Sequence, residues 1–113
     1  MEFSAAVTAL SALAYEGRLM IFRELVQAGP EGLAAGEVAR RVGMAPSTLS
    51  ASLTVLSHAG LVTSRREGRS ILYAAAYEQM AELLAYLVED CCNGRPEVCA
   101  PLAAIRARVA CGV

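Results

Sequence analysis

Residues 36–75 read GEVARRVGMAPSTLSASLTVLSHAGLVTSRREGRSILYAA, and this stretch decides the fold. Its apolar spacing predicts a short helix over 34–42, which Gly43 closes. After a turn, a second helix is predicted over 46–59, with proline suitably placed at its first position. Its leucines recur on one side and its other side is polar. The stretch therefore begins as two short helices joined by a tight turn.

Two strand-like runs follow these helices, over 61–66 and 69–75, around a two-residue hairpin tip at Glu67-Gly68. Two helices, a tight turn and then a β-hairpin are the order of a winged helix-turn-helix. The predicted fold is therefore mainly α with one β-hairpin. Residues 34–59 form the helix-turn-helix and residues 61–75 form the wing.

The polar side of the helix over 46–59 is rich in small hydroxyl groups. Such groups suit base edges in the major groove, and an alanine or a threonine methyl suits the methyl of thymine. Arginines near this helix and on the hairpin suit phosphate contacts. The predicted DNA-binding residues are Ser47, Thr48, Ser50, Ala51, Thr54, His58, Arg40, Arg41, Arg65, Arg66 and Arg69.

The charge distribution supports a nucleic-acid partner although the net charge of −1 does not. Residues 40–70 hold five arginines against one acid, Glu67, whereas residues 77–92 hold four acids and no base. All ten basic residues are arginine, which favours bidentate contacts to phosphate and guanine but which GC-rich coding explains equally well. The basic segment coincides with the predicted helix-turn-helix and wing.

Apolar helices flank this central part. The segment 3–14 predicts a helix that is apolar all round and therefore buried, at a subunit contact. Tyr15 to Gly17 is expected to break it before a second helix over 18–28, whose inward residues include Leu19. On the other side of the wing, a long helix is predicted over 77–92. With 56% hydrophobic residues in 113, the chain has too little surface to cover its apolar area alone, so we expect an obligate oligomer.

No run in the chain is long and apolar enough to predict a membrane span, and no basic segment predicts a secretory signal. The sequence thus predicts one cytoplasmic domain over 1–113 that has no membrane partner. In the cytoplasm, cysteines serve as ligands or redox groups more readily than as structural disulfides. The cysteine-bearing tail over 91–111 therefore predicts a sensor.

The stretches SALAYEGRLMIFREL and GEVARRVGMAPSTLSASLTVLSHAGLVTSRREGRSILYAA resemble the ArsR/SmtB family of dimeric bacterial repressors. The resemblance covers roughly residues 7–92 and implies a homodimer, built from dimerisation helices over 1–15 and 77–92, that binds a palindromic operator and is released by a metal or metalloid. One arsenic site of the family has a Cys-x-Cys pair near the start of the third helix, and residues 33–38 here contain no cysteine. The zinc site of other members needs histidine along the last helix, and the only histidine here is His58.

What remains is Cys91, Cys92 and Cys99, which are similar to the cysteines that end the last helix of arsenite-responsive members. Soft thiolates are the preferred partners of As(III) and Sb(III), which take three sulfur ligands. We therefore predict a metalloid site at these three cysteines. The alternatives are a Zn, Cd or Pb site that recruits Cys111, and a redox or persulfide switch.

The predicted function is an arsenic-responsive transcriptional repressor, a dimer that binds double-stranded operator DNA and dissociates when As(III) binds. A different class of protein, a thiol metalloid buffer that binds no DNA, is the competing hypothesis. An enzyme is not expected, since no oxyanion or cofactor loop accompanies the thiols.

Overall fold

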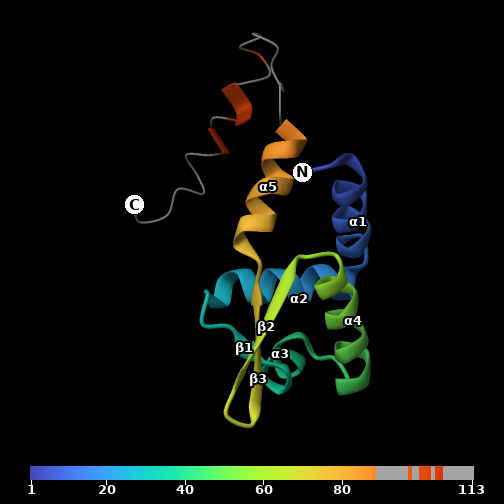
Figure 1. The fold of residues 1–113 in the computed structure, drawn as a ribbon, viewed down its shortest axis with the longest axis vertical. Coiled ribbons are helices and arrows are strands. Elements are labelled where there is room, and N and C mark those ends of the chain that lie inside the picture. The colour runs from blue at the N-terminus through green and yellow to red at the C-terminus, as the bar shows by residue number, and fades with distance from the viewer. Residues whose placement is uncertain (89–96, 98–99, 103, 106–113) are drawn as a thin grey trace. The chain divides into compact units, whose positions relative to one another are not determined.

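The computed structural model describes residues 1–88, 97, 100–102 and 104–105. The chain divides into two compact units, Met1–Leu83 and Leu84–Val113. The elements in chain order (Figure 1) are α1 (Phe3–Leu13), α2 (Glu16–Ala28), β1 (Leu33–Ala34), α3 (Ala35–Val42), α4 (Pro46–His58), β2 (Val62–Glu67), β3 (Ser70–Ala75) and α5 (Tyr77–Val88). The predicted mainly helical, winged helix-turn-helix fold is confirmed.

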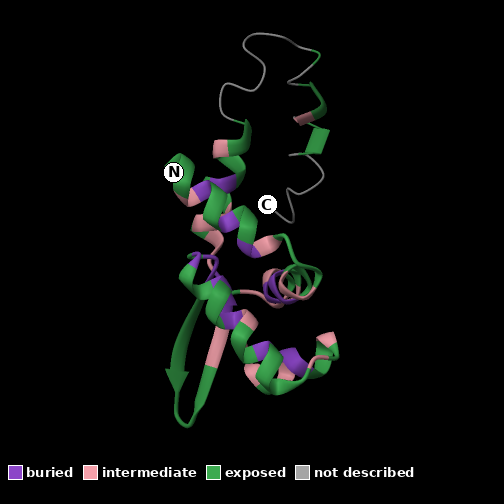
Figure 2. Ribbon diagram, turned by 90° about the vertical axis from the view of Figure 1, so that its right-hand side faces the viewer, coloured by how far each residue is buried: buried purple, intermediate pink, exposed green. Residues whose placement is uncertain are grey.

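The core of the first unit is an aliphatic cluster that α2, α3 and α4 share. Its largest fully buried side chains are Ile21, Leu25, Leu49, Leu56, Leu61 and Val38. Leu49, Leu53 and Leu56 recur at helical spacing and lie on the inner face of α4, as predicted. Each such side chain stabilises the fold by about 1.5–3 kcal/mol. Figure 2 shows this buried layer between the helices, while the hairpin of β2 and β3 is mostly exposed.

The turn between α3 and α4 has the geometry that the sequence predicts. Gly43 ends α3 in the left-handed conformation with φ 67°, and the Met44 amide donates to the Ala39 carbonyl over 3.0 Å. Pro46 begins α4 at a position where no amide proton is needed. These features fix the direction in which α4 leaves the turn.

The sheet has three strands in the order β1-β3-β2, where the sequence predicted a hairpin alone. Leu33 pairs with Tyr73 and Ala34 pairs with Leu72, both antiparallel. The helix expected from residue 34 therefore begins one residue later, because Ala34 is used in the strand. A strand of two residues shows no alternating pattern, so its sequence gives no signal.

The hairpin tip is one residue later than predicted. Glu67 pairs with Ser70, so the two tip residues are Gly68 and Arg69. Gly68 has φ 63°, a conformation that glycine adopts without strain. The predicted strands over 61–66 and 69–75 are accordingly Val62–Glu67 and Ser70–Ala75.

The corner between α1 and α2 is tighter than predicted. Helix α2 begins at Glu16 rather than at Arg18, so Gly17 lies within the helix instead of breaking it. The Arg18 Nε donates to the Ala12 carbonyl over 2.7 Å, and the guanidinium lies 4.0 Å from the centroid of the Tyr15 ring. Arg18 thus satisfies a carbonyl at the end of α1 and holds the corner.

Within the single chain, helix α1 is buried on one side only, and its predicted burial at a subunit contact stays a prediction. Only the alanines at 6, 9 and 12 are buried. The larger residues Phe3, Val7 and Leu10 form a stripe at helical spacing, with exposed fractions of 73%, 46% and 43%. Small alanines let α1 approach its own chain closely, and the bulky apolar stripe remains on the surface. Leu19 of α2, expected to point inward, is also exposed, at 43%.

Replacing Gly32 by alanine is expected to destabilise the fold by about 2–3 kcal/mol. Gly32 has φ +79°, and a Cβ there would lie 2.5 Å from the Tyr73 carbonyl oxygen. The matched control is Gly36→Ala, where a Cβ meets nothing within 4 Å, so its free energy of unfolding should change by less than about 1 kcal/mol. Urea unfolding of both variants measures the difference, and equal stabilities would contradict the close approach of β1 to β3.

No single helix among residues 1–88 is long and apolar enough to cross a membrane; the bent pair α1 and α2, at 100°, reaches that length and composition only together. Helix α5 is described from Tyr77 to Val88, and the predicted continuation over 89–92 lies outside the described residues. Within the first unit, the Tyr77 hydroxyl lies 3.0 Å from the Val26 carbonyl oxygen and 3.3 Å from that of Leu25, which ties the start of α5 to the end of α2.

Candidate nucleic-acid interface

Helix α4 presents a polar face to the surface, because its leucines turn toward the core. All of the predicted contact residues on this helix are exposed: Ser47, Thr48, Ser50, Ala51, Thr54 and His58. The Thr54 hydroxyl donates to the Ser50 carbonyl over 3.0 Å and leaves the threonine methyl free to contact a base. A helix with such a face is suited to the major groove.

The wing shares one face with α4. Ser64 of β2 and Tyr73 of β3 are register partners, and both line a groove with Ser50, Thr54 and His58 of α4. The volume of this groove is about 260 Å³. Ser64 and Tyr73 were not among the residues predicted from the sequence, although strand alternation back from Arg66 identifies Ser64 as a residue of the same face.

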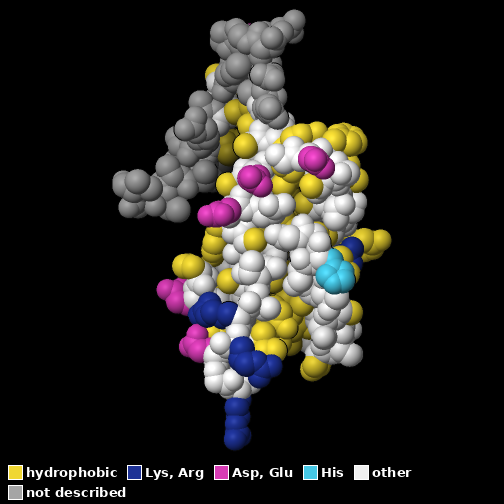
Figure 3. All heavy atoms as spheres, in the orientation of Figure 1, with side chains coloured by type: hydrophobic (Ala, Val, Ile, Leu, Met, Phe, Trp, Pro, Cys, Tyr) yellow, Lys and Arg dark blue, Asp and Glu magenta, His cyan; other side chains and the backbone are white. Residues whose placement is uncertain are grey.

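Arg66 belongs to the face of the wing that adjoins α4. Side chains two residues apart on a strand point the same way, so Arg66 follows Ser64, and its partner Ile71 follows Tyr73. Arg69 is exposed at the hairpin tip. In Figure 3, arginine side chains gather at the wing end of the face that is shown. Arg66 and Arg69 are therefore placed to reach DNA phosphates beside the major groove that α4 would occupy.

Arg65 belongs to the opposite face of β2. Its guanidinium is already engaged by the chain: it donates to the carbonyl oxygens of Pro30 and Glu31 and to the carboxylate of Glu67. The predicted contact of Arg65 with DNA stays a prediction. In the structure, its hydrogen-bond partners belong to the chain itself.

The α3 arginines are likewise paired. Arg40 and Arg41 both contact the carboxylate of Glu37, and Arg41 lies 3.8 Å from the Glu24 carboxylate of α2. Hydrogen bonds from Arg40 first, and from Arg41 second, lower the pKa of Glu37 below its usual 4.5. The same Glu37 contact raises the pKa of Arg41. Glu37 therefore offsets part of the positive charge that the sequence assigned to DNA binding at Arg40 and Arg41.

Replacing Glu37 by glutamine should remove stability that depends on pH. Because the pKa of Glu37 is lowered in the folded state, its stabilising effect is complete above about pH 4.5 and is lost as the pH falls through the folded-state value. Wild-type protein should therefore exceed Glu37→Gln in unfolding free energy at neutral pH, and the gap should close in acid. Urea unfolding across pH 3–7 tests this, with Arg41→Gln as a control that retains the Arg40 pair. A gap independent of pH would contradict it.

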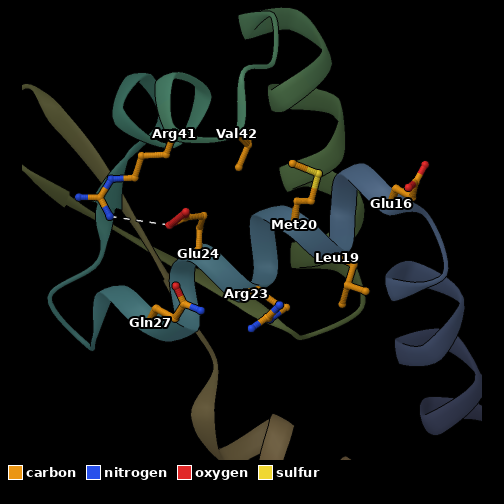
Figure 4. A pocket seen from close by; sticks show the side chains of 8 residues that line it. All are labelled: Glu16, Leu19, Met20, Arg23, Glu24, Gln27, Arg41 and Val42. Carbon is orange, nitrogen blue, oxygen red and sulfur yellow. Dashed lines mark ion pairs between the residues drawn. The ribbon is translucent and has the colours of Figure 1, made fainter.

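A second hollow lies over the outer face of α2, where it meets the end of α3. It has a volume of about 360 Å³ and is lined by Glu16, Leu19, Met20, Arg23, Glu24, Gln27, Arg41 and Val42 (Figure 4). The ion pair of Arg41 and Glu24 lies at its edge. This pair ties the first helix of the helix-turn-helix to α2, so Arg41 also supports the fold.

The predicted metalloid ligands Cys91, Cys92 and Cys99, and Cys111 with them, lie outside the described residues. Within the described part of the chain, no three His, Cys, Asp or Glu side chains gather as a metal site. His58 accordingly has no companion ligands there, and it lies in the last turn of α4 between the wing groove and a hollow against α1.

Comparison with known proteins finds a helix-turn-helix domain family over residues 13–65. The nodulation protein NolR of Rhizobium meliloti is 36% identical over 78 residues, 69% of this chain and 62% of NolR. The transcriptional regulator NmtR of Mycobacterium tuberculosis is 43% identical over 75 residues, 66% of this chain and 60% of NmtR. A biofilm growth-associated repressor of Agrobacterium fabrum is 35% identical over 83 residues, 74% of this chain and 68% of the repressor. The chain thus spans about three fifths of the first two relatives.

Solved structures share the fold. A homodimeric winged helix-turn-helix DNA-binding domain from Mycobacterium bovis is 37% identical with a TM-score of 0.64, over 74% of this chain and 75% of that one. An ArsR-like transcriptional regulator from Rhodococcus sp. RHA1 is 27% identical with a TM-score of 0.70, over 95% and 94%. Reduced HlyU from Vibrio cholerae is 36% identical with a TM-score of 0.59, over 74% and 88%.

Proposed function

The chain belongs to the ArsR family of winged helix-turn-helix transcriptional regulators, and from that premise we propose that it is a cytoplasmic repressor that binds operator DNA as a homodimer. The observation that carries the proposal is the shared face of α4 and the wing. The polar side of α4 lines one groove with Ser64 and Tyr73 of the wing. Arg66 follows Ser64 on the same face of β2, and Arg69 lies at the hairpin tip. Helix and wing together can contact base edges and flanking phosphates of one half-site.

The dimer is supported by the apolar stripe of α1. Phe3, Val7 and Leu10 are exposed on the surface of the single chain, and a second copy of the chain would bury these three side chains. In the second unit, Leu84, Leu87 and Val88 of α5 are also exposed. A related domain of the same fold is homodimeric. Two copies would place their two α4 helices on DNA half-sites about one turn of the double helix apart, so a palindromic operator is expected.

The inducer that we propose is trivalent arsenic or antimony, held by the thiolates of Cys91, Cys92 and Cys99. The support is the inventory of ligands in the sequence: three thiols within nine residues and no histidine nearby. Soft thiolates bind soft ions in preference to magnesium or calcium. Thiols must lose their protons to bind, so the apparent affinity should rise with pH. Zn, Cd or Pb with Cys111 as a fourth ligand is the alternative set.

A thiol-redox or persulfide switch at the same cysteines is the second candidate. The observation that favours it is the relative HlyU, whose solved form is named as reduced. Oxidation would join two sulfurs and would require an oxidant rather than a metal ion. The non-DNA-binding thiol buffer is disfavoured, because the relatives include transcriptional regulators and a repressor.

The test is release of DNA by each candidate inducer. Reduced protein is bound to a fluorescent duplex that the wild type selects from a randomised pool, and arsenite, antimonite, Zn, Cd or an organic persulfide is added. We expect arsenite and antimonite, near one equivalent per site, to weaken binding by about 5- to 150-fold, the usual range of allosteric coupling. Release by Zn or Cd alone, or by persulfide alone, would replace the arsenic assignment. Failure of the wild type to select any sequence would reject the repressor itself.

A further inference from the structure

We propose that Arg65 is a positioning residue, which fastens the wing to the loop between α2 and β1 and so sets the angle at which Arg66 and Arg69 meet DNA. This inference rests on the proposed DNA-binding function and deepens it. The sequence alone predicts phosphate contacts for Arg65, Arg66 and Arg69 alike. The geometry separates Arg65 from the other two.

The guanidinium of Arg65 spans three acceptors. Its Nη2 donates to the Glu31 carbonyl over 2.7 Å, its Nη1 to the Pro30 carbonyl over 3.3 Å, and its Nε to the Glu67 carboxylate over 3.2 Å. Only a planar fork of fixed donors can reach all three acceptors at once. The side chain is 46% exposed, yet each of its three nitrogens is committed within the chain.

The loop that Arg65 holds is built to receive it. Gly29 and Gly32 both have positive φ, and the Gly32 amide closes the turn onto the Gly29 carbonyl over 3.1 Å. This turn leads directly into β1, which has only two residues paired to β3. So short a strand fixes the hairpin weakly, since isolated two-stranded hairpins are marginally stable in water. Arg65 supplies a second attachment, from β2 across to the far side of β3.

The direction of the side chain supports this division of labour. Arg65 and Arg66 are neighbours on β2, so they point to opposite faces of the sheet. The face of Arg66 continues that of Ser64 and Tyr73, which line the groove with α4. The face of Arg65 meets the α2–β1 loop. Arg66 is thus available to contact a phosphate, while Arg65 orients strand β2, which carries Arg66.

The test compares Arg65→Lys, Arg65→Ala and Arg66→Ala on the duplex selected by the wild type, with affinity measured over a range of salt. Lysine keeps the charge, but one ammonium cannot span the two carbonyls and the carboxylate. We expect both Arg65 variants to bind about three- to tenfold more weakly, with the wild-type dependence on salt. Arg66→Ala should instead flatten the slope of log K against log salt by about 0.9, the loss of one phosphate contact.

A readout without DNA accompanies it. Amide hydrogen exchange across residues 29–34 of the free protein should be about three- to tenfold faster in both Arg65 variants than in wild type or Arg66→Ala. Wild-type affinity for Arg65→Lys together with a flattened slope for Arg65→Ala would identify a phosphate contact and overturn the proposal. Unchanged exchange would overturn it as well. If the wild type selects no DNA, the proposed function fails, and exchange alone then decides whether Arg65 holds the wing.

Discussion

Replacing Val7 by aspartate is expected to convert the protein to a monomer and to weaken operator binding by more than about a hundredfold. Val7 lies in the centre of the exposed stripe on α1, between Phe3 and Leu10. In a two-fold symmetric dimer each residue occurs twice at the interface, so one substitution introduces two buried charges. A monomer then binds a single half-site and loses the gain from linking two.

The fold itself should survive this change. Val7 is 46% exposed, and α1 packs on its own chain through the alanines at 6, 9 and 12 rather than through the stripe. Ser4→Asp is the matched control, since it adds the same charge to an exposed position of the same helix, in the first turn where an acid is tolerated. Sedimentation velocity gives the oligomeric state and fluorescence anisotropy gives the affinity. A Val7→Asp dimer that binds DNA as the wild type does would place the subunit contact elsewhere.

The helix-turn-helix was predictable because its signals are local. Gly43 and Pro46 mark where one helix ends and the next begins, and the leucine spacing of 49, 53 and 56 fixes the buried face of α4. The residues of α4 on the side opposite these leucines must then form its exposed face. Hence every predicted contact on α4 is at the surface.

The errors at β1 and at Arg65 have a different cause, which is tertiary contact between distant residues. Strand β1 is too short to have a pattern and exists because β3 accepts it. Arg65 looks like Arg66 in the sequence, but it reaches residues 34 and 35 positions away. The pairing of Arg40 and Arg41 with Glu37 lies at helical spacing and was readable from the sequence. The contact of Arg41 with Glu24 of α2 could not be predicted from the sequence, because the two residues lie on different helices.

Replacing Cys91 or Cys99 by serine is expected to leave operator binding intact and to raise the arsenite needed for release by about a hundredfold or more. Three sulfur ligands complete the coordination of trivalent arsenic, and a serine oxygen is a hard, protonated substitute. Affinity for the inducer therefore falls, while the residues of α4 and the wing are unchanged. Anisotropy titrations of the reduced variants on the selected duplex measure both quantities.

Cys111→Ser is the matched control, because it removes one thiol from the same tail without touching the proposed trio. Under the arsenic hypothesis, Cys111→Ser should respond to arsenite as the wild type does. If it loses its response together with Cys91→Ser and Cys99→Ser, Cys111 belongs to the ligand set, and the tetrahedral coordination of zinc or cadmium becomes the better explanation. If Cys91→Ser and Cys99→Ser both still release DNA at wild-type arsenite concentrations, the cysteines are not the sensor. A response to persulfide that needs two of these cysteines but not the third would instead identify a redox switch, since one disulfide or polysulfide bridge joins only two cysteines.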